Sequence, residues 1–241
     1  MSPVVFFDLP SKQRTAWSLN PWKTRMVLNY KKIEYKTEWI EYPDLAPKLK
    51  SLGVPPNDPS DPGYYAAYSS PAIKLADDTY MLDSWPIAHE LEKRYPAPSL
   101  HLDDPIVEKV RNHISTIMQP LTGFVIPKVP LKILNERSAA YFNETRKQKF
   151  GMPLSEVEKT TMTEENWEKA RRQVKQVGEW LRERGGPYFL GETVSYADFI
   201  FVGMLAMIKR LDDELFRRFL DFDEALPQLF EASKQWLEKD D

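Results

Sequence analysis

A short stretch near the N-terminus has the residue types that hold an anion. It joins an apolar run, residues 4–7, which is typical of a buried strand, to residues 22–30, where large apolar side chains recur at the spacing of one helix face. Asn20 is a good N-cap and Pro21 suits the first helical position, so we expect a strand-to-helix turn here. Ser18 then projects beside the unpaired N–H groups of the helix, which favour a carboxylate, a phosphate or a thiolate. A structural role, in which these polar residues only cap the helix, explains the same pattern equally well.

The chain has no cysteine. This excludes disulfides, thiolate metal sites, a cysteine nucleophile and any mixed disulfide formed on the protein itself. The three histidines, His89, His101 and His113, are isolated and lack the spacing of metal ligands, so we expect no metal site. A Gly-rich nucleotide fingerprint and an HExxH motif are also missing from the sequence.

Charge and hydropathy narrow the classes of partner. The 241 residues carry a net charge of −3, and basic residues are mostly interleaved with acidic ones. Because there is no basic footprint, we expect no nucleic-acid partner and no anionic membrane partner. No apolar run approaches the length of a membrane span, and the N-terminus does not have the form of a secretory signal, so we expect a cytoplasmic protein.

The first part of the chain alternates between strand and helix patterns. Aromatic and β-favouring residues at 34–40 predict a second strand, parallel to the first because a helix connects the two. Further along, we expect a short helix at 44–52, a loop rich in Pro, Gly and Asp at 53–63, strands at 70–75 and 79–82 that form a hairpin, and a helix at 83–95. This order predicts a thioredoxin-like domain with a mixed four-stranded sheet and without the redox cysteines.

The second part of the chain shows only helical patterns. Residues 97–105 contain repeated Pro and Asp and are expected to be a linker. Ser195 and Asp198 have the spacing of a capping box, and residues 199–208 are apolar on every side, which predicts a buried central helix. The predicted fold class is therefore α/β plus all-α: a thioredoxin-like domain over residues 1–96, a linker over 97–105, and an all-helical domain over 106–241.

Together these features resemble the soluble glutathione transferases over essentially the whole chain. Pro71, in Ser-Ser-Pro-Ala-Ile, is similar to the family's cis-proline, and the pair Asp83-Ser84 is similar to the acidic-Ser pair at a helix start, although glutamate is commoner than aspartate there. The segment from Phe189 to Gly191, followed by 195–198, is similar to the folding signature of the family's helical domain. Their order along the chain makes a chance match improbable.

The opening stretch resembles one class within this family, the fungal FuA type, which is related to bacterial β-etherase transferases. The matching residues are 18–25, 28–31 and 39–44. Ser18 falls where omega-like members place a catalytic cysteine, so the resemblance implies that serine stabilises a thiolate and that omega-type reductase activity is absent. It also implies a homodimer and an involvement with aromatic compounds derived from wood.

The resemblance implies glutathione as co-substrate and assigns roles to six residues. Ser18 is the catalytic candidate, and the candidates for glutathione binding are Asn20, Ser70, Pro71, Asp83 and Ser84. The expected activity is transfer of glutathione to hydrophobic aromatic or phenolic electrophiles. A ligandin-type carrier of polyphenols or terpenoids, with little catalysis, remains the alternative, and a module of a translation or regulatory complex is a more distant third. The apolar side chains that would line a hydrophobic site, such as Met118, Phe124 and Tyr141, are as typical of an ordinary core and receive no assignment.

Overall fold

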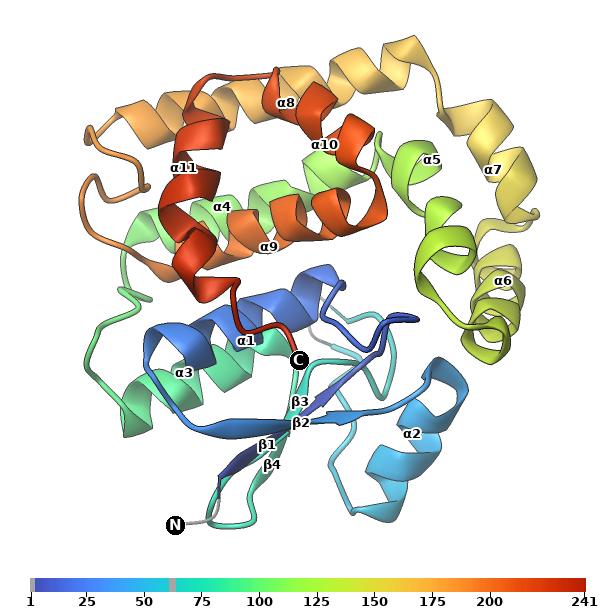
Figure 1. Ribbon diagram of the computed structural model, residues 1–241, viewed down its shortest axis with the longest axis vertical. Helices are drawn as coiled ribbons and strands as arrows, with labels where there is room; N and C mark the ends of the chain where they lie inside the picture. Colours follow the sequence, from blue (N-terminus) through green and yellow to red (C-terminus); the bar gives the residue numbers. More distant parts are fainter. Residues whose placement is uncertain (1–2, 61–63) are drawn as a thin grey trace.

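The computed structural model describes residues 3–60 and 64–241, and its N-terminal part is a sheet with helices packed on it (Figure 1). Residues 61–63 of the predicted loop lie outside the described residues. The elements of this part are β1 (Val4–Asp8), α1 (Leu19–Tyr30), β2 (Tyr35–Trp39), α2 (Tyr42–Ser51), β3 (Ala72–Lys74), β4 (Tyr80–Leu82) and α3 (Ser84–Arg94).

The sheet has the strand order β2-β1-β3-β4. β1 pairs in parallel with β2 and antiparallel with β3, and β3 pairs antiparallel with β4. β1 therefore lies inside the sheet, which is why its apolar run is almost fully buried. The predicted strands, the hairpin and the mixed four-stranded thioredoxin-like sheet are confirmed.

Residues 95–104 contain no helix or strand and lead into a part of the chain that is helical throughout. Its elements are α4 (Pro105–Met118), α5 (Thr122–Val125), the π-helical turn η1 (Val129–Ile133), α6 (Glu136–Phe150), α7 (Leu154–Thr161), α8 (Glu164–Arg182), α9 (Tyr196–Leu211), α10 (Asp213–Leu220), α11 (Ala225–Ser233) and the short η2 (Lys234–Trp236). The helical patterns of this part of the sequence are confirmed as helices, whereas the π-helical turn η1 was not predicted. The division of the chain into residues 1–96, 97–105 and 106–241 remains our proposal.

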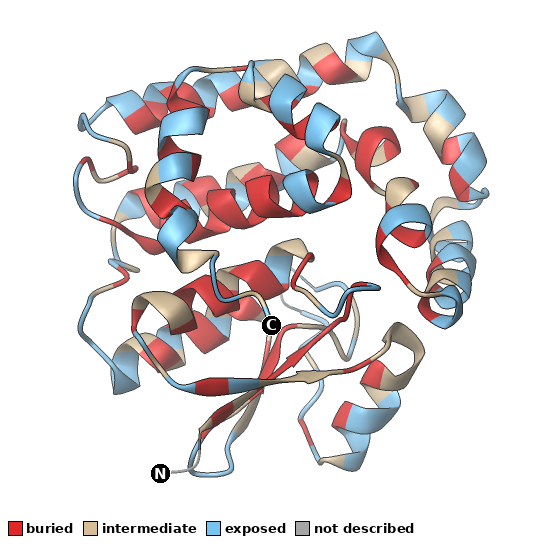
Figure 2. Ribbon diagram, viewed as in Figure 1, coloured by how far each residue is buried: buried red, intermediate tan, exposed pale blue. Residues whose placement is uncertain are grey.

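Helix α9 forms the core of the helical part. Every residue from Tyr196 to Ile208 is buried, and Figure 2 shows this helix as a continuous buried ribbon among its neighbours. Its capping box is present: the Asp198 carboxylate accepts hydrogen bonds from the Ser195 backbone N–H at 2.7 Å and from the Phe189 N–H at 2.9 Å. The predicted capping box and buried central helix are both confirmed.

The two parts of the chain meet where α1 packs on α9. A Cβ atom added at Gly203 of α9 would lie 3.1 Å from the backbone oxygen of Leu19 and 3.4 Å from the Cβ of Trp22. The absence of a side chain at Gly203 thus lets the first turn of α1 approach the α9 backbone closely. This contact sets the position of the α1 N-terminus relative to the helical domain.

Replacing Asp198 by alanine should lower the free energy of unfolding by about 3 kcal/mol, because it removes a cap and leaves buried N–H groups without an acceptor. Urea denaturation of the variant and of the wild type measures the difference.

Asp104→Ala is the matched control, since Asp104 caps α4 by accepting from the Ile106 N–H at a more exposed site. We expect a loss of about 1 kcal/mol there. Equal losses in the two variants would contradict the central structural role of the α9 cap.

Candidate functional site

Ser18 occupies the N-cap position of α1. Its backbone is extended, with φ −81° and ψ 142°, and its carbonyl oxygen accepts from the Trp22 N–H at 3.1 Å, which closes the first turn. The Ser18 side chain makes no capping hydrogen bond. The residue is half-buried, so a hydroxyl group stands beside the unpaired N–H groups of the helix without being used to cap them.

The prediction that Asn20 caps this helix is wrong. Asn20 is the second residue of α1 and is exposed, and Pro21 is the third residue rather than the first. Serine and asparagine are about equally good N-caps, so side-chain preference alone did not separate the two registers. Pro21 is tolerated at the third position because no N–H of the first turn has a partner within the helix.

Hydrogen bonds to the end of β1 hold the turn that precedes Ser18. The indole N–H of Trp17 donates to the backbone oxygen of Leu9 at 3.0 Å, and the Leu9 N–H donates to the carboxylate of Asp8 at 2.7 Å. Asp8 is the last residue of β1 and is fully buried. The turn is thus tied to the end of the central strand at one side and to α1 at the other.

Ser70 and Pro71 lie where β3 begins, next to the end of β1. The peptide bond between them is cis, as predicted, and Pro71 is buried. The Ser70 hydroxyl donates to the backbone oxygen of Phe7 at 3.3 Å, and the Pro71 oxygen accepts from the Asp83 N–H at 3.1 Å. The structure therefore brings the predicted residues of β3 and α3 into direct contact.

Asp83 and Ser84 form the start of α3, as predicted. Asp83 is the N-cap, with a positive φ of 66°, and its Oδ1 accepts from the Trp85 N–H at 3.1 Å and from the Ser84 hydroxyl at 3.4 Å. Ser84 is buried, and its backbone oxygen accepts from the Tyr196 hydroxyl at 2.9 Å. Because Tyr196 is the first residue of α9, the helical domain holds the start of α3 in place.

Two cations that the sequence did not single out lie near this helix start. Lys23 of α1 is half-buried, and burial lowers the pKa of its ammonium group to about 8, with the charge of Arg111 adding to the fall and that of Asp83 opposing it. The Arg111 guanidinium, from α4, lies 4.5 Å from the centre of the Trp85 ring. Lys23 follows Ser18 by little more than one helical turn, a signal that sequence reasoning could have used. Arg111 is brought here by tertiary packing alone.

Hydrogen bonds and charge interactions connect part of the predicted site. Pro71 and Asp83 are hydrogen-bonded, Ser84 adjoins Asp83, and Lys23 connects this group electrostatically to α1. Among the residues that the structure describes, no hydrogen bond joins Ser18 to Ser70, Pro71 or the start of α3. The arrangement offers a hydroxyl and a helix N-terminus at one end and a carboxylate flanked by two cations at the other, which suits a ligand with an acidic end and an amino-acid end.

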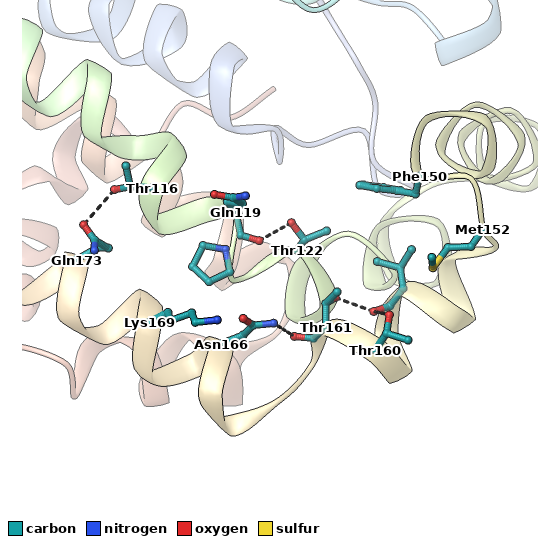
Figure 3. Close-up of a pocket in the computed structure, with 12 residues that line it drawn as sticks. Thr116, Gln119, Thr122, Phe150, Met152, Thr160, Thr161, Asn166, Lys169 and Gln173 are labelled. Atoms are coloured by element: carbon teal, nitrogen blue, oxygen red, sulfur yellow. Dashed lines mark hydrogen bonds between the residues drawn. The ribbon is translucent and has the colours of Figure 1, made fainter.

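A separate cavity of about 620 Å³ lies in the helical domain, among α4, α5, α7 and α8 (Figure 3). None of the six predicted site residues lines it. Its polar side chains largely bond to the protein itself; for example, the Thr122 hydroxyl donates to the Gln119 oxygen at 2.7 Å and the Asn166 amide to the Thr161 oxygen at 2.9 Å. The cavity is therefore distinct from the candidate site.

Two kinds of feature are absent from residues 3–60 and 64–241. No group of three or more His, Asp or Glu residues has the arrangement of a metal site there. No helix in the described part of the chain is long and apolar enough to cross a membrane.

Comparison with known families defines the class of this two-domain architecture. The model of the glutathione S-transferase N-terminal domain matches residues 17–94, and that of the C-terminal domain matches residues 110–238. The chain belongs to the glutathione S-transferase family. Among curated proteins it is 37% identical over 257 residues to the glutathione S-transferase-like protein ustS of Aspergillus flavus, covering 98% of this chain and 92% of the relative.

Solved structures place the chain among fungal members of the family. Glutathione transferase GSTFuA2 from Phanerochaete chrysosporium superposes with a TM-score of 0.88 at 29% identity, over 100% of both chains. A glutathione S-transferase of Ceriporiopsis subvermispora, solved in complex with glutathione, superposes with a TM-score of 0.85 at 30% identity, over 98% of both chains. The resemblance to the FuA type is confirmed.

The pKa of Lys23 tests the electrostatics of the site. It should lie near 8 rather than at the ordinary lysine value of 10.5, and it should fall further in Asp83→Asn, which removes an attractive charge, and rise in Arg111→Gln, which removes a repulsive one. NMR titration of lysines labelled with carbon-13 measures all three values.

A Lys23 pKa that does not respond to either substitution would show that these three charges do not share a site.

Proposed function

We propose that this chain is a serine-type glutathione transferase, in which Ser18 stabilises the glutathione thiolate for attack on hydrophobic aromatic electrophiles. The observation that carries the proposal is the Ser18 side chain, which stands at the N-terminus of α1 without a capping hydrogen bond. Its hydroxyl remains available to donate to a sulfur atom. The family membership supports glutathione as the thiol.

The energy required is modest. A free thiol has a pKa of about 8.5 and is mostly protonated at neutral pH, and each unit of depression takes about 1.36 kcal/mol. A hydrogen bond to a charged group contributes about 1.5–3 kcal/mol, and a helix N-terminus adds about 0.3–1 kcal/mol. Together they lower the thiol pKa by about 1.3 to 3 units, which brings it to about 7 or below.

The remaining predicted residues would then orient the tripeptide. In this proposal the backbone at Ser70 and Pro71 faces the cysteinyl amide, while Asp83 and Ser84 bind the ammonium and carboxylate groups of the γ-glutamyl end. Lys23 and Arg111 supply positive charge beside that carboxylate. In this proposal Asn20, which is exposed on the first turn of α1, donates its amide to the sulfur or to the second substrate.

The chemical step is a displacement or addition at carbon. The thiol proton leaves to water, and the thiolate sulfur forms a bond to the electrophilic carbon. In a displacement the leaving group departs with the bonding electrons; in an addition the π electrons of the attacked double bond move onto the acceptor, which then takes a proton from water. Ser18 keeps its own proton and donates a hydrogen bond throughout, so it is not a nucleophile. The protein supplies a positioned hydrogen-bond donor, and water accepts the proton that the thiol loses.

An aromatic surface beside the Ser18 turn supports aromatic second substrates. The rings of Trp17 and Tyr42 lie 6.3 Å apart, and Tyr42 stacks on Tyr141 of α6 at 6.3 Å. Tyr141 and Tyr65 are 41% and 54% exposed, so aromatic surface remains accessible there. Planar hydrophobic compounds pack favourably on such rings.

Family membership also supports a proposal for the assembly and the location of the protein. We propose a homodimer in the cytoplasm, with glutathione and small aromatic ligands as its partners. Sedimentation velocity of the purified chain tests the first part, and a single species at the mass of one chain would contradict it.

Ser18→Ala should raise the pKa of bound glutathione by about one unit or more and lower kcat/KM for chlorodinitrobenzene about tenfold at neutral pH. The thiolate absorbance of the binary complex and steady-state kinetics measure the two effects. Ser18→Thr is the matched control, because it retains the hydroxyl and should retain most of the activity.

An unchanged thiol pKa and rate in Ser18→Ala would refute the role of Ser18. A wild-type protein that binds polyphenols tightly but conjugates no electrophile would instead establish the carrier function.

A further inference from the structure

The segment after η2, residues 237–241, leaves the helical domain and lies against the N-terminal domain beside α1 and β2 (Figure 1). The Asn29 amide of α1 donates to the backbone oxygens of Trp236 at 2.8 Å and of Lys239 at 3.2 Å. The Lys239 ammonium lies 3.8 Å from the centre of the Tyr35 ring. These contacts hold the segment against the N-terminal domain.

A buried ion pair is completed by this segment. Arg25 of α1 and Asp8 of β1 are both fully buried and lie 2.9 Å apart. The same guanidinium donates to the backbone oxygen of Asp241 at 2.5 Å. A buried arginine requires acceptors for its several N–H groups, so Asp241 contributes to a polar network whose loss is costly.

The segment also contacts the turn that carries Ser18. The backbone N–H of Ala16, two residues before Ser18, donates to the Asp240 oxygen at 2.7 Å. The Asp240 carboxylate is held in turn by Arg210 of α9 at 2.5 Å. At the start of this turn the Leu9 N–H donates to Asp8, and Asp8 is paired with Arg25, which also contacts Asp241. One connected network therefore holds residues 9–18 at both ends.

We propose that residues 237–241 are a positioning element for the catalytic turn: by holding Ala16 and Arg25 they fix Ser18 and the N-terminus of α1 in the geometry that stabilises a thiolate. This goes beyond the proposed function and rests on the assigned role of Ser18. These residues touch neither glutathione nor the electrophile in the proposal. They act through the backbone position of Ser18, on which the strength of its hydrogen bond to sulfur depends.

Deletion of residues 237–241 tests the proposal. We expect the acid limb of the pH profile of kcat/KM to shift to higher pH and the rate at pH 6.5 to fall severalfold, because the bound thiol becomes a weaker acid. A purely structural role would lower thermal stability without moving this limb. In the Ser18→Ala background the deletion should cause no further shift, since the hydroxyl that it misplaces is already gone.

Arg210→Gln provides a second variant in case the deletion impairs folding. It releases Asp240 by breaking one partly exposed ion pair, a change that costs little stability, and should shift the limb in the same direction by a smaller amount. Arg218→Gln is its matched control, because it breaks a comparable surface pair with Glu164, between α10 and α8, and should shift nothing.

Amide hydrogen exchange separates the failure of this proposal from that of the proposed function. The deletion should increase exchange in residues 10–19 while α9 stays protected. Unchanged exchange in this turn overturns the proposal, whatever the kinetics show. An unshifted pH profile in the deletion variant, alongside a shifted one in Ser18→Ala, overturns it as well and leaves the role of Ser18 intact.

Discussion

The close packing of α1 on α9 is the contact on which the rest of the structure depends. Gly203 allows the first turn of α1 to approach the α9 backbone, and α9 itself is buried along its length and capped by Asp198. The same helix places Tyr196 against the backbone of Ser84. One buried helix thus positions the N-termini of both α1 and α3, the two helix starts that form the candidate site.

The electrostatic character of the site follows from these helix starts. Ser18 adds a hydroxyl donor to the unpaired N–H groups of α1, and Asp83 places a carboxylate at the start of α3, within the field of Lys23 and Arg111. An anion is therefore favoured at one end, and a group that carries both charges at the other. Glutathione has this distribution of charge, with a thiolate at one end and the ammonium and carboxylate of its γ-glutamyl group at the other. The site therefore agrees with membership of the glutathione S-transferase family.

Local features of the sequence predicted much of this fold. The apolar run of β1, the Asp-rich hairpin turn, the start of α3 at Asp83 and the capping box at Ser195 each depend on residues close in the chain, and each is present. The cap of α1 was assigned to Asn20 instead of Ser18, because both residues have the same local preference and only the helical register, set by packing on α9, decides between them.

The features that sequence reasoning missed depend on long-range contacts. Arg111 reaches the site from α4, and Asp240 reaches Ala16 from the other end of the chain. No spacing rule connects residues so far apart in sequence. Lys23 is different, since it lies close to Ser18 on the same helix; its altered pKa, however, comes from burial that only the folded structure supplies.

A crystal structure of the protein with glutathione bound tests the role of Ser18 directly. We expect the sulfur to lie within hydrogen-bonding distance of the Ser18 hydroxyl at the N-terminus of α1, with the γ-glutamyl group at Asp83 and Ser84. A glutathione sulfur held elsewhere, with water or another side chain on the Ser18 hydroxyl, would contradict it.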